Sequence, residues 1–212
     1  MRKIFIALAV FAFGIMSIAY AATQGATVSE GATGQITESS AGQNVAQGGN
    51  VTIINLTATV STDKWQGYYG NVTGTLALGY GAFSFYDFSG AAPITVFASQ
   101  NQTFDFASLA ATDSSNIDTD WGYNTATDND QAVDVYTISN SIGGVTVNST
   151  LLNGGATRIT GIFSDGNTGD KENYAFGANV TNGAAFDGNN WDYQLMVPVN
   201  VTTETYYFYV EI

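Results

Sequence analysis

The stretch WQGYYGNVTGTLALGYGAFSFYDF, residues Trp65–Phe88, decides the fold class of this chain. Eight of its 24 residues are aromatic, five are glycine, and its single charge is Asp87. A period of two places alternate residues on one face of a pleated strand. The apolar residues that follow this period are Tyr68, Val72, Leu76, Leu78 and Tyr80. Glycines on both sides of Tyr80 predict a sharp turn into the second aromatic run. The stretch therefore predicts a β-hairpin in which the even positions up to Tyr80 face the core.

Strand patterns of the same kind recur along the chain, and Gly-Asn, Asp-Gly and Asn-Gly pairs separate most of them. The predicted strands outside the hairpin are residues 50–61, 94–99, 133–139, 144–152, 157–164, 173–180, 192–201 and 205–212. Residues 103–123 have room for a short helical insertion, in which Ser115 caps a turn with Ile117 and Trp121 on one face. The sequence predicts a single all-β domain, a β-sandwich or jelly roll of about nine or ten strands with one short helical insertion.

The last predicted strand, residues 205–212, carries apolar side chains on both faces. Such a strand is typical of the interior of a sheet that is covered on both sides. At an unprotected edge it would promote aggregation. We therefore expect that this strand is buried within the subunit or covered by a neighbour.

The N-terminus has the pattern of a secretory signal peptide. Two basic residues, Arg2 and Lys3, precede the apolar run Ile4–Ala21, which ends in Ala-Tyr-Ala. The alternative is an uncleaved membrane anchor, since the run reaches the length that begins to suggest a span. We predict cleavage after Ala21, which makes the protein secreted, located at the cell surface and free of the membrane.

The charge and composition exclude several classes of function. Cleavage leaves three basic residues against 18 acidic ones, a formal charge of −15. Such a surface repels nucleic acid and anionic lipid. The chain has no cysteine and no histidine, which excludes serine–histidine and cysteine–histidine catalysis and most zinc sites. We expect that the protein is not an enzyme and requires no cofactor; a glycosidase with two carboxylates is a distant alternative.

Seven asparagines lie in Asn-x-Ser/Thr sequons, the acceptors of N-linked glycans. They are Asn50, Asn55, Asn71, Asn101, Asn148, Asn179 and Asn200. Most fall on the polar face of a predicted strand, where a glycan can project into solvent. The sequence therefore predicts a glycoprotein, although outward-facing strand asparagines without glycans give the same placement.

An acidic cluster supplies candidate ligands for calcium. Its oxygen-bearing side chains are closely spaced between residues 118 and 130, and Ca²⁺ prefers oxygen ligands. The candidates are Asp118, Asp120, Asn124, Asp128 and Asp130. The simpler interpretation is a set of solvated turn residues in an acidic protein.

Residues 22–49 differ from the rest of the chain because they contain no aromatic residue and few aliphatic ones. They form either a flexible tail or an extended segment that adds a strand to another subunit. The strand motifs WQGYYGNVTGTLALG and YQLMVPV…TYYFYVEI resemble those of small secreted proteins of thermophilic archaea, the pilin-like subunits of archaeal threads and bundling pili. The resemblance implies donor-strand complementation, with Val28, Ile36 and Val45 entering pockets of the next copy.

We therefore expect a structural subunit of an extracellular filament, whose partners are copies of itself. The hairpin residues opposite its core-facing positions, Tyr69, Tyr86 and Phe88, are further candidates for the subunit interface. The alternative is a monomeric carbohydrate-binding or adhesive module that binds surface glycans through exposed aromatic residues, with Trp65 and Trp191 as the candidates.

Overall fold

The computed structural model describes residues 23–80, 82–88, 94–123, 130–132, 145–147, 150–152, 161–200 and 202–212. Within these residues the chain is built from antiparallel β-strands and a single short α-helix, so the predicted all-β class is confirmed. None of the helices in these ranges is long and apolar enough to cross a membrane. The predicted signal peptide and the predicted strand 133–139 lie outside the described residues.

The largest sheet has six antiparallel strands in the order β1-β14-β5-β10-β9-β6. Its central strands are apolar on both faces, and every residue of β5 is buried. The strands are β1 (Gln24–Gly25), β14 (Tyr207–Glu211), β5 (Thr95–Ser99), β10 (Tyr174–Asn179), β9 (Gly161–Ser164) and β6 (Ala110–Ala111). The C-terminal strand thus lies inside the sheet, as expected, but only the two-residue β1 covers its outer edge.

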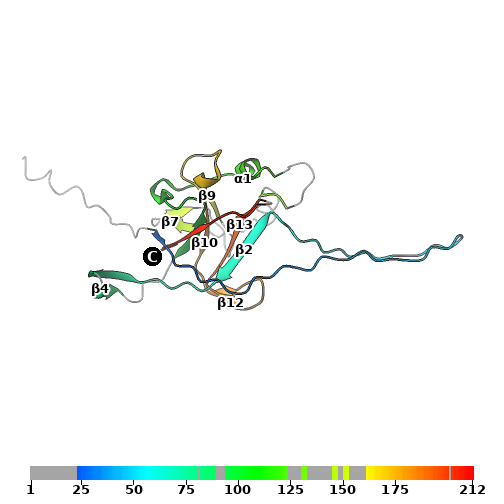
Figure 1. Cartoon of the computed structure of the whole chain (residues 1–212), viewed down its shortest axis with the longest axis horizontal. Helices are drawn as coiled ribbons and strands as arrows, with labels where there is room; N and C mark the ends of the chain where they lie inside the picture. The colour runs from blue at the N-terminus through cyan, green and yellow to red at the C-terminus, as the bar shows by residue number, and fades with distance from the viewer. Residues whose placement is uncertain are drawn as a thin grey trace, which may run out of the picture.

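A second, smaller sheet packs across one face of the first. It pairs β2 (Trp65–Gly70) with β13 (Tyr193–Pro198), and β13 contacts β10 and β5 (Figure 1). The core between the two sheets contains Val96 and Phe176 from the large sheet and Leu195 and Val197 from β13. This arrangement has two layers, as the sandwich prediction requires, but the second layer is only two strands wide in the described part of the chain.

Helix α1 (Ser114–Trp121) closes one end of this core. Its buried residues Ile117 and Trp121 lie four positions apart, as the sequence predicts. The N-cap, however, is Asp113, whose carboxylate accepts a hydrogen bond from the Ser115 backbone N–H at 2.9 Å. The helix ends at Gly122, which has a φ of 70°, a conformation that glycine adopts without strain.

The opposite face of the large sheet carries a separate aromatic core. Its buried members are Phe97, Phe104, Phe163, Tyr209 and Ala175. The 3₁₀ helix η1 (Phe106–Ser108) covers it, and the Phe106 ring lies 5.2 Å from that of Phe97. Strand alternation thus sends β5 side chains into two different cores.

The remaining strands form short antiparallel pairs. They are β3 (Leu76–Tyr80) with β4 (Phe83–Phe88), β7 (Val145–Val147) with β8 (Thr150–Leu152), and β11 (Gly183–Ala184) with β12 (Asn190–Trp191). A second 3₁₀ helix, η2 (Lys171–Asn173), precedes β10. The hairpin predicted over Trp65–Phe88 is therefore confirmed only for Leu76–Phe88, since Trp65–Gly70 forms β2 and pairs with β13 instead.

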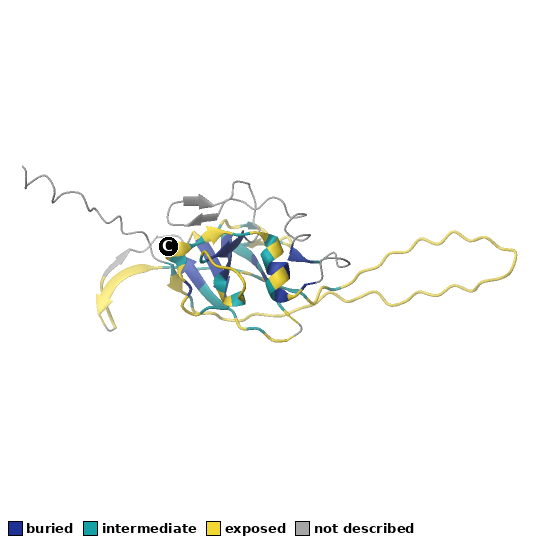
Figure 2. Cartoon of the chain, turned by 90° about the horizontal axis from the view of Figure 1, so that it is seen from above, coloured by how far each residue is buried: buried dark blue, intermediate teal, exposed yellow. Residues whose placement is uncertain are grey.

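Two segments that the sequence assigns to the core lie outside it. Leu76 and Leu78 are more than half exposed, and Tyr80 is 92% exposed, so the prediction that these side chains face the core is wrong. Residues 50–61 form no strand of the sheet and stand away from the domain (Figure 2). Alternation places side chains on a common face of a strand, but it does not say whether anything covers that face.

Candidate assembly surface

The most prominent surface feature is a long arm, residues 35–61, that projects from the domain beyond the start of β2 (Figures 1 and 2). Two extended legs run side by side: the Ser39 backbone N–H donates to the Thr59 carbonyl at 2.9 Å. At the base, the Gln35 side chain donates to the Ser61 hydroxyl at 3.0 Å. At the tip, the chain turns at Gly49, whose φ is 84°. Glycine adopts this conformation without strain, and the arm therefore ends in a tight turn.

The arm is exposed, nearly uncharged and carries a set of large aliphatic side chains. Every residue from 35 to 60 is exposed, and Glu38 is the one charged residue between 35 and 61. The large aliphatic residues on its surface are Ile36 (66% exposed), Val45 (93%), Val51 (99%), Ile53 (90%), Ile54 (55%), Leu56 (89%) and Val60 (79%). Five of these seven lie in the return leg, residues 50–61. An exposed segment of β-branched residues without charge or proline is a template for pairing with another chain.

The start of the N-terminal segment, by contrast, pairs with its own domain. Gln24 lies opposite Val210 and Gly25 opposite Tyr209 in the antiparallel pair β1–β14. The Ala26 backbone N–H continues this ladder by donating to the Phe208 carbonyl at 2.8 Å. Residues 23–49 therefore combine an intramolecular strand with one leg of the arm.

The β3–β4 hairpin is a second exposed apolar element. It stands at the end of the molecule opposite the tip of the arm (Figures 1 and 2). Tyr80 is 92% exposed, Phe83 82% and Phe85 84%. The pairing shifts at Gly79, where an added Cβ would lie 2.5 Å from the Phe83 carbonyl oxygen. Glycine is therefore required for this irregular turn.

The predicted interface residues lie in three different places. Val28 is 55% exposed on the chain between β1 and the arm, whereas Ile36 and Val45 lie in the arm itself. Tyr69 is 42% exposed and packs against the rings of Phe186 and Trp191 at centroid distances of 4.9 and 5.4 Å. Tyr86 and Phe88 belong to β4, but their side chains lie outside the described residues.

The acidic residues that are described bind protein donors on separate elements. Asp118 is buried and accepts from the Ala132 backbone N–H at 2.6 Å. Asp120 accepts from the Gly169 backbone N–H at 2.9 Å and from the Tyr174 hydroxyl. No group of three or more acidic side chains suited to a metal ion occurs among the described residues. Asn124 and Asp128 lie outside them, and calcium binding stays a prediction.

Asp130 connects residues 130–132 to the base of the arm and to β2 by hydrogen bonds. Its carboxylate accepts from Lys64 Nζ at 2.7 Å and from the Thr62 hydroxyl at 2.5 Å, while its carbonyl accepts from Trp65 Nε1 at 2.5 Å. Burial raises the pKa of Asp130, but the hydrogen bonds from Lys64 and Thr62 and the charge of Lys64 outweigh it and hold this pKa below its usual value. The half-buried Trp65 is therefore a packing residue and not an exposed sugar platform.

The sequons divide by exposure. Asn50, at the tip of the arm, Asn55, in its return leg, and Asn71 and Asn200 are exposed, whereas Asn101 and Asn179 are half-buried. Asn148 lies outside the described residues. The Asn101 side-chain oxygen accepts from the Thr103 backbone N–H at 2.9 Å, which holds this sequon in a local turn.

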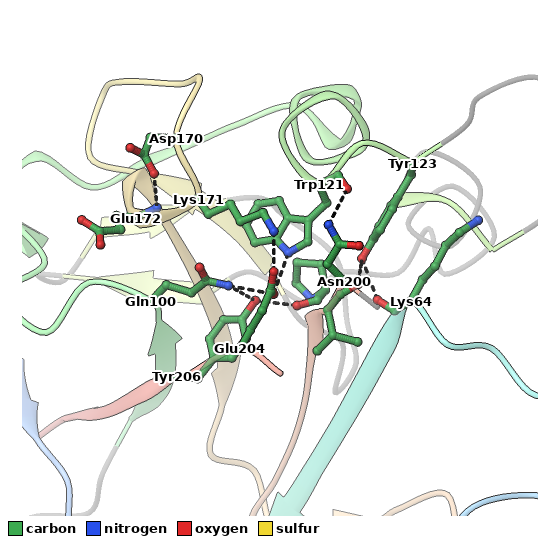
Figure 3. A network of polar contacts seen from close by, with 12 residues as sticks. Lys64, Gln100, Trp121, Tyr123, Asp170, Lys171, Glu172, Asn200, Glu204 and Tyr206 are labelled. Atoms are coloured by element: carbon green, nitrogen blue, oxygen red, sulfur yellow. Dashed lines mark hydrogen bonds and ion pairs between the residues drawn. The ribbon is translucent and has the colours of Figure 1, made fainter. Parts of the chain in front are cut away.

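A polar network ties α1 to the loops at the same end of the core (Figure 3). Glu204 is its centre: one carboxylate oxygen accepts from Gln100 at 2.9 Å and from Trp121 Nε1 at 3.0 Å, and the other pairs with Lys171. The Lys171 ammonium also lies 5.2 Å from the centre of the Trp121 ring. Both charges are mostly buried and paired with each other, which is the arrangement of a structural tie between elements.

Sequence reasoning missed the return leg of the arm and the exposed position of the β3–β4 hairpin. One signal for the arm was present: aliphatic residues occupy both odd positions, such as Val51 and Ile53, and even positions, such as Ile54 and Leu56. A strand with apolar residues on both faces needs a cover on both. The Gly48–Gly49 pair before it marks the turn at the tip.

Comparison of the chain with family models, curated proteins and solved structures finds no match. The fold and the surface define the class of protein directly: an all-β domain that carries an extended exposed arm and an exposed apolar hairpin.

Proposed function

We propose that the protein is the structural subunit of an extracellular, pilus-like filament in which copies join by β-strand complementation. The single observation that carries the proposal is the arm, in which seven large aliphatic side chains are at least 55% exposed. Such a surface is costly in water at about 25 cal/mol per Å² of apolar area, and pairing with a neighbour removes that cost. Because the arm binds a different surface of the next copy, the contact repeats without closing and gives a fibre.

The arm replaces residues 22–49 as the proposed donor. Residues 24–26 are paired to β14 of the same chain, so the part that leaves the domain is 35–61. In the proposed filament, main-chain hydrogen bonds along the arm supply affinity, and the aliphatic side chains supply register.

Electron microscopy of the purified chain tests this function. We expect filaments at micromolar concentration and their loss when Ile53 and Leu56 are both replaced by aspartate. Both side chains are about 90% exposed, so the domain keeps its fold and thermal midpoint. A wild-type chain that stays monomeric at high concentration contradicts the proposal.

A second candidate, binding of surface glycans, rests on the cluster of Tyr69, Phe186 and Trp191. Phe186 is 73% exposed and offers an apolar ring to a sugar. Tyr69 meets the rings of Phe186 and Trp191 edge to face, so it does not share a flat platform with either ring. Polysaccharide pull-down with Phe186→Ala distinguishes the two: loss of carbohydrate binding with unchanged filaments supports glycan recognition at this cluster.

The exposed sequons support the further proposal that the chain carries N-linked glycans. Peptide mass spectrometry of protein from its native source should find a glycan at one or more of the exposed sequon residues, which are Asn50, Asn55, Asn71 and Asn200. Unmodified peptides covering all four contradict it.

A further inference from the structure

We propose that the β3–β4 hairpin of one copy is the docking site for the return leg of the arm, residues 50–61, of the next copy. This inference rests on the proposed function and names both sides of its contact. The two elements project from opposite ends of the molecule, as both views show (Figures 1 and 2). A contact between them is head-to-tail, which is the geometry that an open filament requires.

The hairpin is incomplete as a sheet. β3 and β4 pair only with each other in the described part of the chain, and all five residues of β3 are exposed. An isolated two-stranded hairpin is marginal in water, and a third strand with apolar side chains stabilises it. The return leg is twelve residues long, enough to cover the six residues of β4. Its contacts with the other leg lie at the base, where the backbone of Thr59 and Ser61 bonds to Ser39 and Glu38, and between residues 51 and 58 its backbone makes no hydrogen bond to that leg.

The exposed area is sufficient for a stable contact. Tyr80, Phe83 and Phe85 are each more than 80% exposed. At about 150–250 Å² per aromatic side chain, they offer about 400–600 Å². Leu76 and Leu78 are each more than half exposed and add to this surface. The total approaches the roughly 800 Å² that each partner buries in a standard interface.

Charge identifies the occupant as a second copy of this chain. The whole chain has a formal charge of −13, so most approaches between two copies are repulsive. The arm and the β3–β4 hairpin are the exception: Glu38 and Asp87 are the two charges that they contain together. Docking the arm of one copy on the hairpin of the next brings two acidic molecules together at surfaces where neither carries a cluster of charge. The outer edge of β14, another potential acceptor, is partly occupied by β1 and Ala26.

A complementation experiment with two blocked chains tests the contact. The arm-blocked chain carries Ile53→Asp and Leu56→Asp, and the hairpin-blocked chain carries Phe83→Asp and Phe85→Asp. Each is expected to be monomeric alone in analytical ultracentrifugation. An equimolar mixture is expected to form a 1:1 dimer that grows no further, because only one intact arm and one intact hairpin remain. Phe186→Asp is the matched control, an equally exposed aromatic residue outside both elements, and it should polymerise like the wild type.

Each other outcome overturns a defined part of the account. If the hairpin-blocked chain polymerises, the hairpin is not the acceptor, while the filament function stands. If that chain forms dimers alone, arms pair with arms. If Phe186→Asp is the variant that blocks assembly, the contact lies at the Tyr69 cluster. Failure of the wild-type chain to polymerise contradicts the proposed function itself.

Cysteine cross-linking keeps the test valid if the charged variants misfold. The chain has no cysteine, so a cysteine introduced by substitution cannot form a disulfide with a native one. Chains carrying Leu56→Cys and Phe83→Cys are mixed under oxidising conditions, and a covalent heterodimer is expected, since a disulfide requires Cα atoms within about 7 Å. No heterodimer above the level given by Leu56→Cys with Phe186→Cys contradicts the contact.

Discussion

At the scale of single residues, Glu204 shows how one buried carboxylate joins separate segments of this acidic domain. Its side chain is 9% exposed and receives donors from Gln100, Trp121 and Lys171, which come from three separate segments. No local sequence pattern identifies Glu204 as a buried and paired residue, because it lies in an ordinary polar run, NVTTET. Tertiary contacts alone define it.

We expect that Glu204→Gln lowers the free energy of unfolding by about 1–3 kcal/mol, because the amide leaves Lys171 without its counter-charge and presents a donor to Trp121 Nε1–H. Lys171 is 26% exposed, and solvent screening keeps the loss below that of a fully buried pair. Urea denaturation followed by tryptophan fluorescence measures it. Glu172→Gln, at an exposed position one residue after Lys171, is the control and should change stability by less than about 0.5 kcal/mol. Equal effects of the two substitutions contradict the role of Glu204.

The lowered pKa of Asp130 predicts that the stability of the fold depends on pH. Its pKa is lower in the folded state than the value of 3.8 in an unfolded chain, so the unfolded state binds the proton more tightly. The carboxylate therefore stabilises the fold above about pH 4, and this contribution is lost as the pH falls through the folded-state pKa. We expect a difference in urea midpoint between wild type and Asp130→Asn that is largest near neutral pH and narrows below about pH 4. A difference that is independent of pH shows that the ion pair with Lys64 contributes nothing.

At the scale of elements, local rules predicted many of the strands and the helix but not where each lies, and residues 50–61, predicted as a strand, form none. Ile117 and Trp121 are spaced for one helical face, and the fold buries both. The N-cap is Asp113 and not Ser115, because the helix begins at Ser114 and the Asp113 carboxylate accepts the backbone N–H of Ser115. The period of two in Leu76–Tyr80 gave a real hairpin, but that hairpin is exposed. A period of two in the sequence indicates that a segment forms a strand and which of its residues share a face. Whether that face is covered depends on distant segments of the chain or on another molecule.

The β3–β4 hairpin depends on Gly79. A Cβ at this position would lie 2.5 Å from the Phe83 carbonyl, so Gly79→Ala should open the hairpin. Because the hairpin lies outside both cores, the thermal midpoint should stay within about 2 °C of the wild type. Limited chymotrypsin digestion should cut faster at Tyr80, Phe83 or Phe85, and filament formation should weaken. Gly67→Ala, a strand glycine with open space around its Cβ position, is the control. An unchanged cleavage rate in Gly79→Ala contradicts this account.

At the scale of the whole molecule, charge and apolar surface are segregated. The domain carries nearly all of the acidic residues, whereas the arm and the hairpin, at opposite ends, carry almost none. The all-β class was predictable from composition and alternation, because those are properties of the single chain. The exposed positions of the arm and of the hairpin were not predictable, since the three-dimensional path of the chain decides which apolar segments are left uncovered.

This segregation makes assembly dependent on salt. Copies with a formal charge of −13 repel one another over roughly 30 Å at 0.01 M ionic strength and about 8 Å at 0.15 M. The proposed contact is apolar, so salt weakens the repulsion and leaves the attraction intact. The chain concentration at which filaments first scatter light should therefore fall as NaCl rises from about 0.01 to about 0.3 M. The arm-blocked chain should scatter at neither salt concentration, which separates assembly from precipitation. Filaments that dissolve as salt increases would show that ion pairs hold the copies together, and the apolar arm would then not be the principal contact.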